Sequence, residues 1–278
     1  MVLRTSMFHL STMRTRLLSF RLLTAFFAFL LSCADYAGPP YLTDDPETVE
    51  YQHWEFYIST IQDHNFNGLT PTSGWSGTLP HSELNYGIIS DVQLHVQVEE
   101  AYNKVPGQPM QYGYGETELG VKYRFIHETD YFPQVALYPF LELPTGNEMR
   151  ELGSDKAQVF LPLWFQKNLG KDWQTFGGGG YWFNPGPGNR DWWYTGWAIQ
   201  RKMTEKLNVG VEVFHEGPQM QGQSASTGAN FGAVLDITEN YHLLASAGHT
   251  LQGGFLAYFG IQFTWGPEAP KKIDKPEK

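Results

Sequence analysis

The 278-residue chain has a single cysteine, Cys33, and only 17% of its residues are charged. With 15% aromatic residues it does not have the composition of a disordered chain, and its 29 glycines and 17 prolines disfavour a helical bundle. Basic residues are scarce as well, since the formal net charge is -10. The composition therefore argues against a nucleic-acid partner, which would need a basic surface. The length fits one all-β domain.

Long hydrophobic runs are also missing. The one apolar run, residues 22–31, is about half of the roughly 20 residues that a membrane-spanning helix needs. Arginines precede it and small residues follow it, a pattern that predicts a secretory signal peptide over residues 1–37, cleaved after Ala34 or Ala37. Residues 30–33 resemble a lipobox, which leaves a lipidated Cys33 as an alternative. Cleavage after Ala37 leaves no cysteine, so no disulfide is expected in the exported protein.

Apolar and polar residues alternate with a period of two over several stretches, as in β-strands with two different faces. In the clearest stretch, Val92, Leu94, Val96 and Val98 alternate with polar residues. The same alternation covers residues 116–125, 207–213, 229–236 and 255–265. Stretches of about ten residues have the length of tilted strands that cross a membrane.

Short and long connections also alternate along the chain. The expected tight turns are 90–91, 127–132, 168–172, 203–206 and 238–240; the longer loops are 61–78, 103–112, 144–156, 184–191 and 217–227, with a short last one at 252–254. This asymmetry is typical of outer-membrane barrels. The sequence predicts an all-β, antiparallel up-and-down transmembrane β-barrel of about 12 strands between His53 and Trp265. The barrel domain is expected to span 38–265, followed by a charged tail over 266–278.

A soluble β-sandwich or a lipocalin-like barrel would show the same alternation with the apolar faces turned inward. A soluble barrel with this many strands would have difficulty filling its interior, which favours the membrane protein. Aromatic residues near the expected strand ends also indicate interfacial girdles. The girdle residues are predicted to be Trp173, Trp182, Trp192, Trp193, Tyr241 and Trp265.

Several motifs resemble a bacterial family of outer-membrane transporters named after the meta-cleavage pathway of phenol degradation. They are the segments 38–47 (GPPYLTDDPE), 53–57 (HWEFY), 83–87 (ELNYG), 91–95 (DVQLH), 115–125 (GETELGVKYRF) and 143–146 (LPTG). The resemblance covers residues 38–265. It implies an outer-membrane channel in a Gram-negative envelope that passes small solutes, aromatic or hydrophobic compounds among them. Its expected partners are outer-membrane lipid, the solute and the barrel-assembly machinery. The tail after Trp265 departs from barrels that end at a terminal aromatic residue.

If the strand phase is right, a set of polar residues faces the lumen. The candidates are Glu83, Asn85, Gln93, His95, Gln97, Glu99, Glu116, Glu118, Lys122, Arg124 and Glu212. They either form a lining that selects solutes, as rings of charge do, or a network of ion pairs that plugs the barrel, a reading favoured for Glu118, Lys122 and Arg124. The second reading makes the protein a non-conducting barrel with a structural or partner-binding role.

Catalysis is not expected. A lipase-like barrel enzyme is the third alternative, but the chain has no Gly-x-Ser-x-Gly elbow and no serine supported as a partner for His95 or His215. Neither a cofactor nor a metal is expected, since there is no His-Glu-x-x-His and the acids at 44, 45 and 47 lack the spacing of a calcium loop. Those acids are expected in a solvated periplasmic segment that can fold into the barrel end. The glycines 177–180 are expected to permit either bending of a strand or close approach of a lumen side chain.

Overall fold

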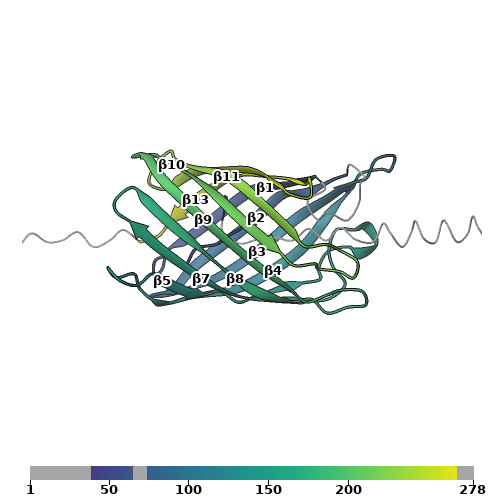
Figure 1. Cartoon of the computed structure of the whole chain (residues 1–278), viewed down its shortest axis with the longest axis horizontal. Coiled ribbons are helices and arrows are strands. Elements are labelled where there is room, and N and C mark those ends of the chain that lie inside the picture. The colour runs from purple at the N-terminus through teal and green to yellow at the C-terminus, as the bar shows by residue number, and fades with distance from the viewer. Residues whose placement is uncertain (1–38, 65–73, 268–278) are drawn as a thin grey trace, which may run out of the picture.

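The computed structural model describes residues 39–64 and 74–267, which form a closed β-barrel whose strands are tilted against its long axis (Figure 1). The predicted signal peptide and most of the charged tail lie outside the described residues. No helix within the described ranges is long and apolar enough to cross a membrane. The strands are β1 (Trp54–His64), β2 (Trp75–Ile89), β3 (Val92–Lys104), β4 (Gln111–Ile126), β5 (Gln134–Leu137), β6 (Phe140–Leu143), β7 (Gln158–Leu169), β8 (Trp173–Phe183), β9 (Trp192–Thr204), β10 (Leu207–Glu216), β11 (Ser226–Asp236), β12 (Tyr241–Thr250) and β13 (Phe255–Trp265), with a short 3-10 helix η1 (Glu148–Arg150) after β6.

Apart from β5 and β6, which do not pair with each other, strands that follow one another in the chain pair antiparallel, and β1 pairs with β13 to close the wall. Both β5 and β6 lie between β4 and β7, so they are two halves of one strand and the wall has twelve strands. The interruption falls where Pro139 and Pro162 remove two ladder donors. The carbonyl of Pro139 still accepts from Val121 N at 3.1 Å, and that of Pro162 from Tyr138 N at 3.3 Å. The prediction of a twelve-stranded up-and-down barrel is confirmed.

The connections differ in length between the two ends of the barrel. At the end where β1 starts and β13 finishes, the turns are short, as between Ile89 and Val92 or Thr204 and Leu207. At the opposite end the connections are longer, as between Leu143 and Gln158 or Glu216 and Ser226. The turn and loop positions predicted from the sequence agree with these boundaries within a few residues wherever the chain is described.

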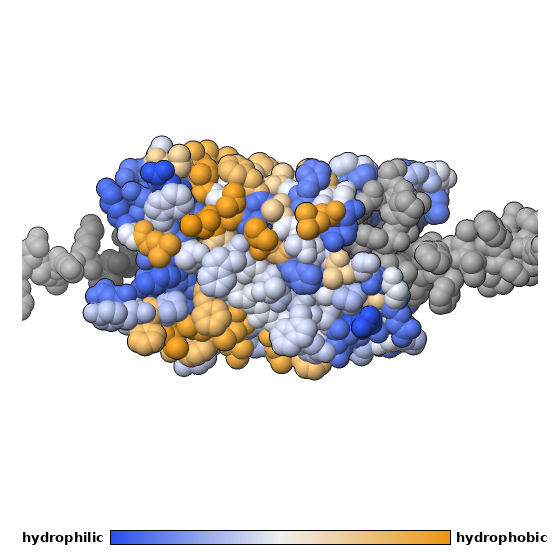
Figure 2. Space-filling model, viewed as in Figure 1, coloured by the Kyte–Doolittle hydropathy of each residue, from blue (hydrophilic) through white to orange (hydrophobic). Residues whose placement is uncertain are grey.

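The outer face of the wall is apolar. Val211, Val213, Phe231 and Phe259 all point outward with about half of their surface exposed. Hydrophobic residues gather over the middle of the wall and hydrophilic ones toward its two ends (Figure 2). Exposed apolar area of this extent is unfavourable in water and favourable against lipid, so the wall has the surface of a membrane barrel.

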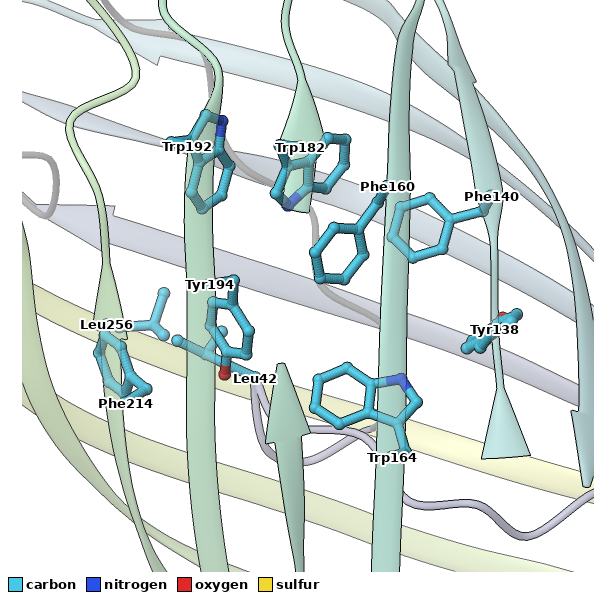
Figure 3. Packing of buried hydrophobic residues seen from close by; sticks show 10 residues of the cluster. All are labelled: Leu42, Tyr138, Phe140, Phe160, Trp164, Trp182, Trp192, Tyr194, Phe214 and Leu256. Atoms are coloured by element: carbon cyan, nitrogen blue, oxygen red, sulfur yellow. The ribbon is translucent and has the colours of Figure 1, made fainter. Parts of the chain in front are cut away.

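Part of the lumen is filled by aromatic side chains. The cluster comprises Leu42, Tyr138, Phe140, Phe160, Trp164, Trp182, Trp192, Tyr194, Phe214 and Leu256. Figure 3 shows Trp192, Trp182, Phe160 and Phe140 in one row across neighbouring strands. The rings of Trp182 and Trp192 stack at 5.4 Å and 9°, and those of Phe160 and Trp182 at 4.8 Å and 15°. Together with the edge-on contacts of Phe140 with Phe160 and Trp182, this stack joins β6, β7, β8 and β9 from the inside.

The girdle prediction is therefore wrong for Trp182 and Trp192, which are 2% and 4% exposed inside the barrel. Neighbouring side chains on a strand face opposite ways, so Trp182 and Phe183 cannot both face outward. Phe183 and Trp193 take the outer face at this end instead. Of the other girdle candidates, Trp173, Trp193, Tyr241 and Trp265 all lie on the outside, each more than 40% exposed.

The glycines of β8 make room for lumen aromatics, as expected. A Cβ added at Gly178 would lie 3.0 Å from the ring of Trp164, and one added at Gly180 would lie 2.7 Å from that of Phe160. Both glycines point inward, so their lack of a side chain is what allows the two rings of β7 to lie against the β8 backbone.

Candidate functional site: the lumen

The structure places the predicted lumen residues inside the barrel. All of them except Arg124 are buried, with exposures of at most 6%. The buried ones are Glu83, Asn85, Gln93, His95, Gln97, Glu99, Glu116, Glu118, Lys122 and Glu212. Arg124 is partly exposed, because it lies close to the end of β4. The structure thus supports the prediction of which side chains on these strands face the lumen. A role of these side chains in selecting solutes stays a prediction.

A polar network around His95 joins the inner faces of β2, β3 and β4. His95 Nε2 lies 2.8 Å from Glu118 Oε1, and its Nδ1 lies 2.8 Å from Asn85 Oδ1. The amide of Asn85 donates to Glu83 Oε1 at 2.7 Å. On the same wall, His81 Nδ1 lies 3.5 Å from Glu99 Oε2. Carboxylates without water need such partners, so this wall is a built network of charges rather than a row of free ones.

Glu118, Lys122 and Arg124 do not form the single ion-pair network suggested by the sequence. Glu118 contacts His95, whereas Arg124 Nη2 contacts Asp91 Oδ1 at 2.6 Å in the turn before β3. Lys122 Nζ instead lies 2.9 Å from Oδ2 of Asp44, a residue that precedes the barrel. The reason is spacing: the three side chains share a face, but Glu118 and Lys122 are four positions apart along β4 and Lys122 and Arg124 are two apart, so each meets a different neighbour.

The partner of Lys122 belongs to the stretch that the sequence predicts as a solvated segment at the barrel end. Residues 39–53, here called the lumen segment, precede β1. Tyr41, Leu42, Thr43 and Asp44 are all buried inside the barrel, whereas Glu50, Tyr51 and Gln52, next to β1, are exposed. In Figure 3, Leu42 lies among the aromatic side chains of the wall. The expectation of a segment at the barrel end is thus right about its place, but wrong about solvation for Asp44, which is 3% exposed. Its apolar residues Tyr41 and Leu42 were the sequence signal for burial.

The innermost part of the lumen segment is held by Glu212 of β10. The backbone N–H groups of Leu42 and Thr43 donate to its carboxylate at 3.2 and 2.5 Å, and the side-chain amide of Asn230 donates at 2.7 Å. The hydroxyl groups of Thr43 and Tyr194 are 3.0 Å apart. Glu212 is fully buried, so these donors replace the water that its carboxylate would otherwise require.

Outside the membrane-spanning strands, Asp91 in the turn between β2 and β3 has a shifted pKa. Burial acts to raise it, but hydrogen bonds and charge from Arg124 outweigh burial and lower the pKa of this carboxyl, with a further contribution from His127. His127 Nε2 lies 3.0 Å from Asp91 Oδ2. The turn at this end of the barrel is thus fixed by a charged cluster.

Two hollows flank the lumen wall. A polar cavity of about 260 Å³ lies between the lumen segment and the wall, lined among others by Asp44, Glu55, Glu83, Lys122 and Gln262. An apolar hollow of about 610 Å³ lies beside the interruption at Pro139, where Leu94, Leu119 and Val121 line it. Within the part of the chain that the structure describes, no group of three or more His, Cys, Asp or Glu side chains is arranged to hold a metal ion.

These features define a class: a closed twelve-stranded antiparallel barrel with an apolar outer wall and a polar and aromatic interior, the fold of outer-membrane barrels. Among solved structures, the chain is similar to an outer membrane channel from Pseudomonas putida F1, with a TM-score of 0.63 and 14% identity over 85% of this chain and 100% of the other. It is also similar to the KdgM porin, with a TM-score of 0.52 and 12% identity over 75% of this chain and 99% of the porin. At such identities the likeness shows the fold alone. No protein-family model and no curated protein matches the chain.

Proposed function

We propose that this protein is an outer-membrane channel for the passive passage of small solutes. The observation that carries the proposal is the combination of an apolar outer wall with buried charged and polar side chains inside. A barrel that only needed to be stable would gain nothing from burying these charges, since an ion pair out of water often does no better than packed apolar residues. Structural likeness to a channel and a porin supports the same reading of the fold.

The side chains of the interior also support a proposal for the chemical class of the solute. Its buried charged side chains are mostly carboxylates, Lys122 being the exception among Lys and Arg residues in the described ranges. Such a lining repels anions and favours neutral or cationic solutes. The stacked rings of Phe160, Trp182 and Trp192 make part of the interior apolar. Together with the family resemblance of the sequence, this supports small aromatic or hydrophobic compounds as the solute class, with no catalytic step and no cofactor.

The cellular location and the partners of the protein are proposed as well. The predicted signal peptide directs export, and the outer face requires membrane lipid around it. Folding in the bacterial outer membrane then requires the barrel-assembly machinery.

Swelling of liposomes that contain the purified protein tests the proposal. We expect swelling in isotonic solutions of small neutral solutes, at rates that fall with solute size. Folding is checked in the same samples by detergent extraction and by gel migration that changes on heating. A protein that is folded by these criteria but gives no swelling with any solute contradicts the channel.

One observation favours the second candidate, a non-conducting barrel with a structural or partner-binding role. The aromatic cluster and the lumen segment occupy much of the interior in this structure. The two candidates differ in whether this filling is permanent. They are therefore separated by experiments that fix or remove the lumen segment.

A further inference from the structure

We infer that the lumen segment, residues 39–53, is a detachable plug, and that its withdrawal from the groove around Glu212 opens the channel. This inference rests on the proposed function and deepens it, because it names the part of the chain that controls passage.

The wall has a receptor site shaped for this segment. A Cβ added at Gly232 would lie 2.6 Å from Cε1 of Tyr41, and one added at Gly210 would lie 2.5 Å from its hydroxyl. A Cβ added at Gly196 would lie 1.9 Å from Oγ1 of Thr43. These inward glycines come from three adjacent strands, β9, β10 and β11, and Gly210 and Gly232 are directly paired. The missing side chains form the groove in which the segment lies.

The contacts in this groove are specific but not covalent. Glu212 binds the backbone of Leu42 and Thr43, and Ser246 donates its hydroxyl hydrogen to the carbonyl of Pro40. A buried carboxylate that uses backbone N–H groups as partners needs the segment present, or water in its place. Withdrawal of the segment therefore lets water enter at Glu212, which is the first requirement for a conducting path.

A second set of contacts holds the segment on its way back to β1. Asp44 pairs with Lys122, with distances of 2.9 and 3.1 Å. Glu47 Oε1 accepts from the side-chain amides of Gln166 at 2.5 Å and Gln134 at 3.4 Å. The amide of Gln93 accepts at its Oε1 from Val49 N at 3.0 Å. All of these partners are polar groups that water can replace.

The segment is not part of the sheet. In the described ranges, its backbone-to-backbone hydrogen bonds to the wall are confined to the Gln52 and His53 contacts with Gly87, and its one bridge is Tyr51 with Gly87. Processing after Ala34 or Ala37, as the sequence predicts, would leave the segment next to a free N-terminus. It would then be covalently attached to the barrel at β1 alone. The segment can leave the lumen without breaking any strand pair.

A disulfide between Thr43→Cys and Gly196→Cys locks the segment in place. The Cβ added at Gly196 lies 3.2 Å from Cβ of Thr43, close to the roughly 3.5–4.5 Å span of a disulfide, so a small shift of the segment suffices. Single-channel currents are recorded in planar bilayers for the same sample before and after reduction. We expect the oxidised protein to lose the openings seen in wild type and the reduced protein to regain them. Each single-cysteine variant is the control for either substitution alone.

A release variant tests the opposite direction. Gly232→Leu places a side chain where the ring of Tyr41 lies, and the three nearest atoms to its Cβ all belong to Tyr41. We expect its open fraction to rise about tenfold over wild type, which corresponds to the loss of a modest part of the docking free energy. Gly113→Leu is the matched control, because the nearest atoms to an added Cβ there are 3.4 and 3.5 Å away and belong to loop residues.

The outcomes separate the plug from the channel. Openings lost on oxidation and regained on reduction, with more openings in Gly232→Leu, support the plug. Equal conductance of the oxidised and reduced protein overturns the plug and leaves the channel intact. Failure of wild type, the reduced protein and Gly232→Leu to conduct, although all are folded by heat-modified gel migration, overturns the channel and the plug with it.

Discussion

Replacement of Phe231 by arginine tests whether the apolar face of the barrel meets lipid. Phe231 is the sixth of the eleven residues of β11 and is 58% exposed on the outer face. Eleven residues at about 3.4 Å each, tilted by about 40°, give a wall of roughly 28 Å, which matches a hydrocarbon core of about 30 Å. Phe231 therefore lies near the midplane of the bilayer.

The expected cost follows from that depth. Arginine on the lipid face costs about 2–4 kcal/mol at the midplane and about 0–1 kcal/mol near the interface. The equilibrium between folded and unfolded protein should thus shift by roughly 30-fold to 800-fold for Phe231→Arg, at about 1.4 kcal/mol per factor of ten. Leu94→Arg should cost less, because Leu94 is the third residue of β3 and lies close to the turn at Asp91.

Urea-dependent unfolding from lipid vesicles measures these differences. Phe231→Leu is the control for loss of the ring, and Gln93→Ala is the control on the inner face, where we expect a mild effect. A large cost for Phe231→Arg, a smaller one for Leu94→Arg and mild effects for both controls are expected. Equal costs of Phe231→Arg and Phe231→Leu would refute the assignment of this face to lipid.

Two further predictions concern the interior and the turns. Trp182→Ala should destabilise the barrel by about 3–5 kcal/mol, because it removes the middle ring of a buried stack. Trp193→Ala on the outer face should cost less. Urea unfolding of the two variants measures these costs, and equal costs would contradict the inward placement of Trp182. Since the pKa of Asp91 is lowered in the folded protein, its ion pair should stabilise the barrel above the unfolded pKa of about 3.9 and cease to do so as the pH falls through the lowered folded value. Near neutral pH, wild type should be more stable than Asp91→Asn by up to about 1 kcal/mol and should therefore melt at a higher temperature. In acid the two melting temperatures should converge. A difference in melting temperature that does not change with pH would contradict the ion pair.

The sequence predicted the barrel well because its wall obeys a local rule. Alternation with a period of two fixes which side chain of each pair faces outward, as for Leu94 and Gln93, and turn lengths fix the order of the strands. Both signals lie within a few residues of one another. The inward placement of His95, Glu118 and Glu212 follows from the same rule.

The wrong predictions concern residues for which the alternation of side chains leaves two possible orientations, or for which there is no alternation at all. Trp182 and Phe183 are both aromatic, so position near a loop did not decide which one faces lipid; only the phase of β8 does. The partners of Lys122 and Glu212 lie 78 and 169 positions away in the chain, in a segment with no periodic pattern. Their contacts depend on the closed wall and on the glycines of three strands, which no local pattern reveals. The interruption at Pro139 also splits a strand that the alternation counts as one.

Single-channel conductance of the purified wild-type protein in planar bilayers tests the central claim most directly. We expect discrete current steps from a protein that migrates as a folded barrel before heating, with smaller currents carried by anions than by cations because carboxylates dominate the interior. A folded barrel that remains silent, both as wild type and with the lumen segment displaced by Gly232→Leu, would contradict the claim that this protein is a channel.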